Sequence, residues 1–107
     1  MPFYMIQASY KEEAVKTLIA KPQDRTAAIE KMAKSAGGKL HSLFFCFGEY
    51  DVVAIVEAPD NEAAVATGLV TVAGGAMSKY RTTVLLSPEE AVGAMKRAKK
   101  LSYTPPK

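Results

Sequence analysis

Residues 47–60 constrain the fold of this chain more than any other segment. They run from a polar turn, Gly48-Glu49-Tyr50-Asp51, through an apolar run at residues 52–56 to Ala58-Pro59-Asp60. Val and Ile suit a pleated strand, whereas Gly, Asp and Pro mark the ends of strands. We therefore expect a buried β-strand that the chain enters through a tight turn.

The same residues closely resemble the signature of the GYD-domain family, in which a Gly-(x)-Tyr-Asp turn leads into an apolar strand ending near Ala-Pro. The resemblance extends over roughly residues 3–95. It implies a ferredoxin-like α+β domain, and GYD-type sequences are similar to the group that pairs two sheets into a dimeric α+β barrel. The family is largely without an assigned activity, so the resemblance implies a fold rather than a reaction.

Hydrophobic periodicity predicts the element order β-α-(α)-β-β-α-β-α without help from the resemblance. This is the split βαβ arrangement of a ferredoxin-like βαββαβ sandwich, with an added C-terminal helix. Strands are expected at residues 3–9, 40–47, 52–58 and 77–86. We expect a single domain over residues 1–103 and a flexible tail over residues 104–107.

The predicted helices have recognisable starts and apolar faces. Ser9-Tyr10-Lys11-Glu12 has the form of a capping box, and Ser87-Pro88-Glu89-Glu90 is a more complete one with Pro at the first helical position. Asp60 is expected to cap the third helix, whose core face would be Val65, Leu69 and Val72. The core face of the second helix would be Ile29, Met32, Ala33 and Ala36.

Charge is divided unevenly along the chain. Residues 1–90 carry nine Lys or Arg against eleven Asp or Glu, whereas residues 91–107 carry five Lys or Arg and no acid. Cations in the last turn of a helix complement its dipole, so a solvated helix end explains this cluster better than a nucleic-acid site. No nucleic-acid or membrane partner is expected, because the apolar runs are far shorter than the ~20 residues of a membrane span.

The central hairpin has apolar residues on both faces. Phe45 and Phe47 alternate with Phe44 and Cys46, and the returning strand is apolar throughout residues 52–56. Helices cover one face of such a sheet, so the other face would expose several hundred Å² of apolar surface, which soluble monomers rarely tolerate. We expect a homodimer, or a multiple of dimers, with this face in the interface.

His41 and Cys46 are the only histidine and the only cysteine. His41 falls on the strand parity of Leu43 and Phe45, where it could act as a general base or simply make a hydrogen bond at a strand edge. Cys46 has no basic neighbour in sequence and is expected to be a buried structural thiol. One Cys and one His exclude a structural zinc site within one chain, and no metal or cofactor is expected. A single cysteine and no signal-type leader fit a cytoplasmic location.

Further candidates for ligand binding are Tyr50, Asp51, Tyr4 and Arg81. Tyr50 and Asp51 would present a phenol and a carboxylate at the hairpin tip, but a structural role for the turn is favoured, with Gly48 at positive φ and Asp51 bonding local amides. Tyr4 and Arg81, like Tyr80, lie on strands that could reach an interior cavity. Arg81 could bind a carboxylate or phosphate bidentately, or lie on the surface of an edge strand.

Three classes of function fit this fold. The favoured one is an oligomeric module for assembly or for binding a small apolar or aromatic ligand. The alternative is a cofactor-independent enzyme of the dimeric α+β barrel kind, monooxygenase-like or isomerase-like, with His41 or Asp51 as base. An RNA-binding module is disfavoured, because residues 51–57 offer neither an exposed aromatic side chain nor a cation.

Overall fold

The computed structural model describes all residues 1–107 and contains eight elements in the predicted order. They are β1 (Phe3–Tyr10), α1 (Glu12–Ala20), α2 (Thr26–Ser35), β2 (Lys39–Phe45), β3 (Val52–Glu57), α3 (Asn61–Ala73), β4 (Met77–Leu85) and α4 (Pro88–Ala98). None of these helices combines the length and the hydropathy that a membrane-spanning segment requires. The division between a domain and a tail at residue 104 stays a prediction.

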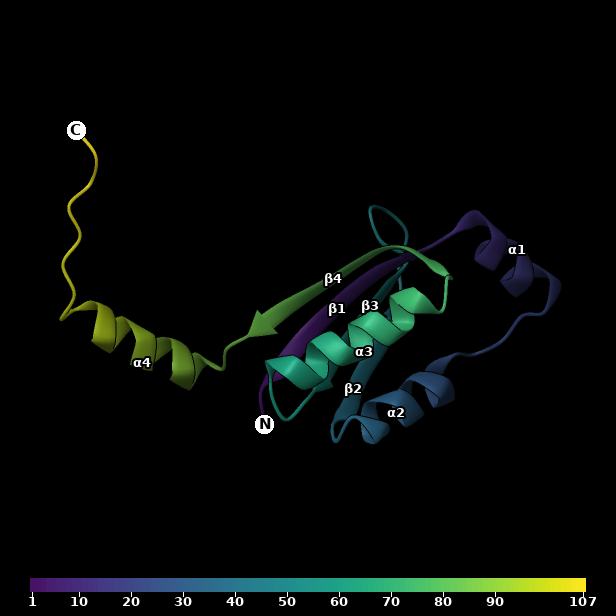
Figure 1. Ribbon diagram of the computed structural model, residues 1–107, viewed down its shortest axis with the longest axis horizontal. Coiled ribbons are helices and arrows are strands. Elements are labelled where there is room, and N and C mark those ends of the chain that lie inside the picture. Colours follow the sequence, from purple (N-terminus) through teal and green to yellow (C-terminus); the bar gives the residue numbers. More distant parts are fainter.

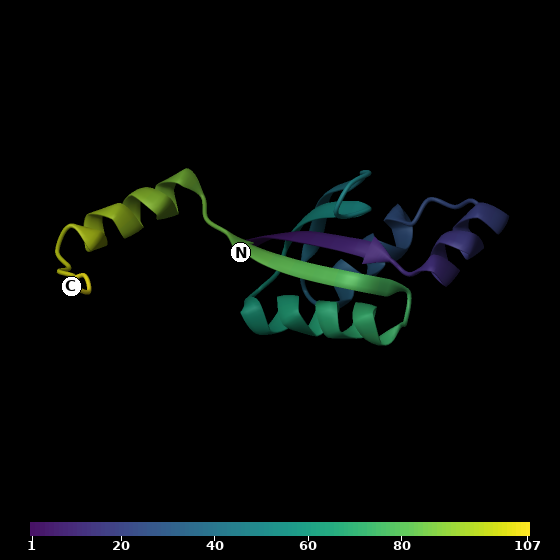
Figure 2. The same cartoon turned by 90° about the horizontal axis from the view of Figure 1, so that it is seen from above.

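The four strands form one antiparallel sheet in the order β2-β3-β1-β4. The first strand is thus central, with β3 on one side and β4, the last strand, on the other. Helix α3 packs against β4 and α2 against β2, on the same face of the sheet (Figures 1 and 2). This is the predicted ferredoxin-like α+β fold, and its other face has no helix of its own chain over it.

The core of the domain is small. Tyr4, Ala58 and Ala64 form its centre, and the Tyr4 side chain, 1% exposed, donates a hydrogen bond of 2.7 Å to Asn61 Oδ1. Only 9 of the 107 residues are buried, so much of the apolar surface of this chain remains accessible. A chain that leaves so much apolar surface uncovered has room either for a ligand or for a partner.

Helix α3 contacts the sheet through a different face from the one that its periodicity predicts. Val65, Leu69 and Val72 are between 48% and 66% exposed, whereas Ala64 and Gly68 are buried. A Cβ added to Gly68 would lie 2.9 Å from Cε1 of Tyr80, so the helix approaches β4 more closely than any larger residue would permit. The prediction of the core face was wrong because close helix packing selects small residues, and large apolar ones were left outside.

The two predicted capping boxes have opposite outcomes. Ser87 accepts from the Glu90 amide and the Glu90 carboxylate accepts from the Ser87 amide, so the box at α4 is confirmed. The box at Ser9 is wrong: Ser9 lies within β1, and its hydroxyl donates to the Glu49 carbonyl. Strand β1 continues to Tyr10 because it still pairs with β4 there, and α1 therefore begins only after Lys11.

Strand β2 contains a bulge that changes the predicted side-chain pattern. Leu40 pairs with Val56 and Ser42 pairs with Ile55, so His41 is an extra residue on this strand. An extra residue shifts the alternation of side chains between faces. His41 therefore lies on the helix-free face, opposite to Leu43, and its predicted parity with Leu43 and Phe45 is wrong.

Helix α4 projects from the body of the molecule, as Figures 1 and 2 show. It contains no buried residue. The radius of gyration is 17.2 Å, whereas a compact domain of this length has a value of about 13 Å. The difference reflects a body made of residues up to Leu85 and an arm that begins beyond it.

Candidate ligand-binding cavity

A cavity of about 630 Å³ opens between the sheet and helices α1, α2 and α3. Twenty of its 29 lining residues are hydrophobic, which is typical of sites for small organic molecules. The predicted apolar face of α2, formed by Ile29, Met32, Ala33 and Ala36, lines one wall, and this prediction is confirmed. Leu18 and Ala14 of α1 line another part of the wall.

Small residues on the sheet make this space. Ala8 and Ala54 lie on the floor of the cavity, where β1 and β3 run side by side. Because a methyl group fills little of the space beneath a helix, α1 and α2 cover the floor without filling it. The cavity thus results from the small residues on β1 and β3, together with the close packing of α3 against β4.

Hydroxyl groups lie at the α3 wall of the cavity. Thr71 donates to the Thr67 carbonyl at 2.7 Å and lies 3.5 Å from the Met32 sulfur, which links α3 to α2. Burial raises the pKa of the Tyr80 phenol, and its hydrogen bonds with Thr67 and Thr71 offset part of that rise. Tyr80 is therefore neutral at physiological pH and available as a donor or acceptor.

Two exposed charged residues, Arg25 and Glu13, line the cavity and mark its mouth. Arg25 lies just before α2, and its guanidinium donates to Gln23 Oε1 at 3.1 Å without forming an ion pair with any carboxylate. Burial raises the pKa of the neighbouring Tyr10 phenol, an effect that Arg25 opposes and Asp51 reinforces. Arg25 is thus the cation that a ligand entering the cavity would meet.

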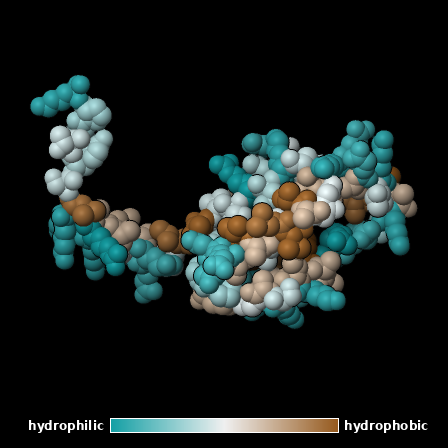
Figure 3. Space-filling view, viewed as in Figure 1, coloured by the Kyte–Doolittle hydropathy of each residue, from teal (hydrophilic) through white to brown (hydrophobic).

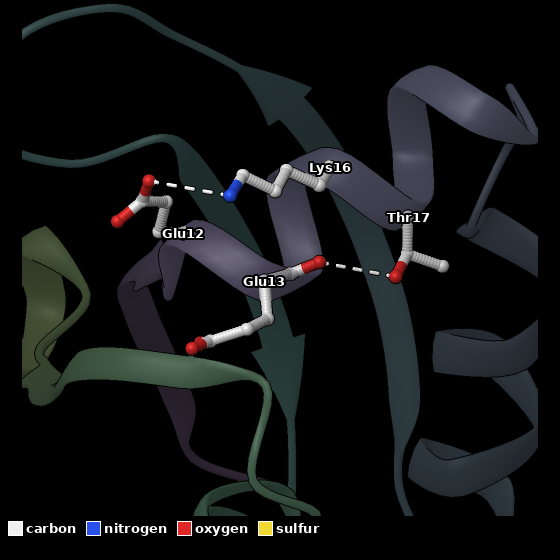
Figure 4. Close-up of polar contacts among 4 residues, drawn as sticks. All are labelled: Glu12, Glu13, Lys16 and Thr17. Carbon is white, nitrogen blue, oxygen red and sulfur yellow. Dashed lines mark hydrogen bonds and ion pairs between the residues drawn. The ribbon is translucent and has the colours of Figure 1, made fainter.

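Glu13 of α1 lies at the same mouth. Figure 4 shows that its carboxylate points away from Lys16, which instead pairs with Glu12 at 3.6 Å. The Thr17 hydroxyl donates to the backbone carbonyl of Glu13 at 3.0 Å, not to its side chain, so the Glu13 carboxylate remains free. A guanidinium and a carboxylate, both without an ionic partner, therefore flank a mostly apolar space.

A second polar site lies on the helix-free face of the sheet. His41 Nε2 is 3.0 Å from Glu57 Oε2, and the His41 ring packs against Phe3 with centroids 4.9 Å apart. The hydrogen bond from His41 lowers the pKa of the Glu57 carboxyl. A carboxylate that fixes an imidazole in this way is the orienting half of a general-base site.

The turn that precedes β3 is a loop of residues 46–51, longer than the expected tight turn. Gly48 has φ of +150°, so the prediction of a positive φ is confirmed. Asp51 does not bond local amides: its Oδ2 accepts from the Tyr10 amide at 3.0 Å, and its own amide donates to the Ala8 carbonyl. The Cys46 thiol donates to the Tyr50 carbonyl at 3.1 Å, which closes the loop.

None of the five predicted ligand-binding residues lines the cavity. Tyr4 lies in the core beside it, Tyr50 and Asp51 belong to the loop at one end of the sheet, and His41 faces the opposite side. Arg81 is exposed on edge strand β4, where it pairs with Gln7 of β1. Gln7 lies four residues along β1 from Phe3, the residue that contacts His41. The structure therefore brings His41 to Glu57 but does not bring His41, Asp51 and Arg81 together.

Arg25 and Tyr10 line the cavity although the sequence does not mark either as a binding residue. Tyr10 was assigned to a helix cap, and Arg25 lies in the connection before α2, where neither a motif nor a periodic pattern marks it. The available signal was the pair of alanines at positions 8 and 54, because small residues in otherwise bulky strands indicate space above them.

A family comparison explains the resemblance of residues 47–60. The model of the GYD domain matches residues 4–95. The chain belongs to the GYD domain family. No protein of curated function matches the sequence.

Solved structures similar to this GYD domain share its fold at low sequence identity. MtbAldR matches 80% of this chain and 53% of its own at a TM-score of 0.62 and 16% identity. A transcriptional regulator of Neisseria meningitidis, solved in complex with L-Met, has a TM-score of 0.52 and 15% sequence identity. The match covers 81% of this chain and 51% of the regulator. FFRP-DM1 has a TM-score of 0.50 and 14% sequence identity, and the match covers 80% of this chain and all of the FFRP-DM1 chain. The GYD chain thus spans about half the length of the first and second, and these likenesses show the fold alone.

Proposed function

We propose that this GYD domain is an oligomeric module that binds a small, mostly apolar ligand in the cavity between its sheet and helices. The observation that carries the proposal is a cavity of about 630 Å³ with an apolar wall and an unpaired guanidinium at its mouth. A small molecule with an anionic end suits this arrangement, because Arg25 can bind a carboxylate or similar group while the apolar part displaces water. The Neisseria regulator, about half of which shares this fold, was solved in complex with L-Met, a small molecule with an apolar side chain and a carboxylate.

The helix-free face supports the oligomeric part of the proposal. Phe3, Met5, Phe44, Val53 and Ile55 lie on this face of three adjacent strands. Covering them with a second copy would remove this apolar area from water. We propose a cytoplasmic homodimer, or a multiple of dimers, in which these faces meet.

Anilinonaphthalene sulfonate is a suitable first probe, since it joins an aromatic body to an anion and fluoresces in apolar sites. We expect saturable binding that Ala54→Phe abolishes by filling the floor of the cavity. Arg25→Gln should weaken binding by about ten- to a hundredfold, since one charge-assisted hydrogen bond contributes about 1.5–3 kcal/mol. Arg81→Gln, an arginine outside the cavity, is the matched control and should bind like the wild type. Equal binding by all four proteins would contradict the assignment of the cavity.

The His41–Glu57 pair favours a second candidate, a cofactor-independent enzyme with His41 as base. Asp51 is less suited to this role, because its carboxylate already accepts a backbone hydrogen bond. A base-catalysed ring opening of 5-nitrobenzisoxazole tests the candidate directly: the base takes the carbon-bound proton as the N–O bond breaks. Turnover lost in His41→Gln but kept in Arg81→Gln would support the enzyme, and a rate equal to that of free imidazole would exclude it.

A further inference from the structure

Helix α4 is amphipathic although it contacts no core. Pro88, Ala91, Val92, Met95 and Ala98 recur at spacings of three and four residues, which places them on one face. Val92 is 47% exposed and Met95 66% exposed. An apolar face on a projecting helix indicates a surface that something else covers.

Helix α3 carries a matching face on the outside of the body. Val65, Leu69 and Val72 lie at spacings of four and three residues and are left uncovered because α3 packs through Ala64 and Gly68. Figure 3 shows hydrophobic surface in the middle of the body, over α3 and β4, and again along α4. The two helical faces are thus of the same kind and of similar length.

The charges of the two helices are complementary. Helix α3 begins with Asp60 and Glu62 and has no basic residue in its last turn, whereas α4 ends with Lys96 and Arg97, followed by Lys99. An antiparallel pairing would bring the basic end of α4 to the acidic start of α3. The two helix dipoles would also be antiparallel.

We propose that α4 is an arm that docks on α3 of a second copy of this chain, antiparallel to it. Because both helices rise equally per residue, one register aligns their faces along the whole contact. With Val92 level with Leu69 of the other copy, Met95 lies within one residue of Val65 and Lys99 is level with Glu62. The proposal does not depend on whether the cavity binds a ligand, and it uses a surface distinct from the helix-free face of the sheet.

A second copy suits the arm better than a lipid surface. A membrane-surface helix usually combines a basic polar face with large apolar anchors such as Trp, Phe and Leu. The face of α4 offers Ala, Val and Met instead, and Glu89 and Glu90 in its first turn would be repelled by anionic lipids. The complementary face on α3 is present on every copy.

Cysteine cross-linking between two differently labelled chains tests the docking. In a Cys46→Ser background, chains with Val92→Cys are mixed with chains of a different mass that carry Leu69→Cys, and disulfides are formed under mild oxidation. We expect a mixed dimer as the main product. Gly93→Cys replaces Val92→Cys in the control, because position 93 lies on the opposite side of α4, and it should cross-link at least tenfold less.

Three outcomes would overturn the proposal. A chain carrying both Val92→Cys and Leu69→Cys that closes on itself as a monomer would show that the arm folds back on its own body. No preference for Val92→Cys over Gly93→Cys would show that α4 does not dock on α3. Sedimentation of the protein with phosphatidylserine vesicles, lost in Met95→Glu and accompanied by no mixed dimer, would assign the arm to membranes instead.

Charge reversal gives an independent test of the register. Glu62→Lys and Lys99→Glu should each weaken association in sedimentation at low salt by about threefold, and the double variant should restore it. This restoration should disappear at 1 M salt, where the screening length falls to about 3 Å. Additive weakening in the double variant would contradict the proposed alignment of these two residues.

Discussion

The two faces of the central sheet use side-chain size in opposite ways. Under the helices, β1 and β3 present Ala8 and Ala54, and a cavity remains above them. On the helix-free face the same strands present Met5, Val53 and Ile55, with no element of the chain to cover them. The covered face thus leaves space and the uncovered face is apolar, which is what the proposed ligand site and the proposed dimer interface require.

The largest effect is expected from a charge at the centre of the helix-free face. Ile55→Glu would place a carboxylate opposite Met5, at a cost of at least several kcal/mol if a partner copy removes it from water. We expect dissociation or unfolding, detected by light scattering and melting. Lys79→Glu, an exposed position at the edge of the same face, is the control and should leave both unchanged. A wild-type protein that is monomeric at micromolar concentration would contradict the proposal that the helix-free face is a dimer interface.

Gly68→Ala tests the close packing on the covered face. The added Cβ would lie 2.9 Å from Tyr80 Cε1, so the ring or the helix must move, at a cost of about 1–3 kcal/mol. Gly93→Ala in α4 is the matched control, because nothing lies near its added Cβ and the helix should gain about 0.5–1 kcal/mol. Denaturant unfolding measures both, and a stabilised Gly68→Ala would show that α3 is not held at this distance.

The loop of residues 46–51 joins β2 to β3 and is hydrogen-bonded to the end of β1. Asp51→Ala removes the acceptor of the Tyr10 amide and should cost about 0.5–2 kcal/mol. Gly48→Ala should cost on the order of 1 kcal/mol because φ is positive there. Tyr50→Phe keeps the ring and should melt like the wild type. Unchanged melting in all three, with loss of probe binding, would make this loop a ligand site instead of a structural one.

The smallest effect is expected at the His41–Glu57 pair. The hydrogen bond from His41 lowers the pKa of Glu57 below its ordinary 4.5. A carboxyl group with a depressed pKa in the folded state stabilises the protein above its ordinary pKa. The contribution is lost as pH falls from about 4.5 through the lower, folded-state pKa. Glu57→Gln should therefore flatten the acid side of the stability curve, and an identical pH profile would show the pair to be energetically neutral.

The element order was predictable because turns and periodicity are local signals. The capping box at Ser87 and the apolar face of α2 followed from spacing alone. Three features depended on contacts between distant residues and were not predictable. They are the bulge at His41, the pairing with β4 that keeps Ser9 in β1, and the close contact of Gly68 with Tyr80, which determines the face through which α3 packs on the sheet.

The cavity could be predicted only in part for the same reason. Tyr80 was recognised as a strand residue near an interior, but Arg25 and Glu13 reach the mouth through the placement of α1 and α2. Side chains in connections and on short helices have no pattern that reports where they will lie. The candidate site is therefore a property of how the helices sit on the sheet.

The central position of β1 has a consequence for how this chain reaches its fold. Phe3 pairs with Glu57 and Leu85, so the first strand meets its first partner only when β3 has been synthesised and its second only when β4 has. Pairings this distant in sequence slow folding, because the intervening chain must be ordered before the contact is gained. Until then the apolar residues of β1 are open to other nascent chains. A circular permutant that begins at β3 and places β1 directly after β4 should refold faster in stopped-flow measurements, with the same sheet at the end.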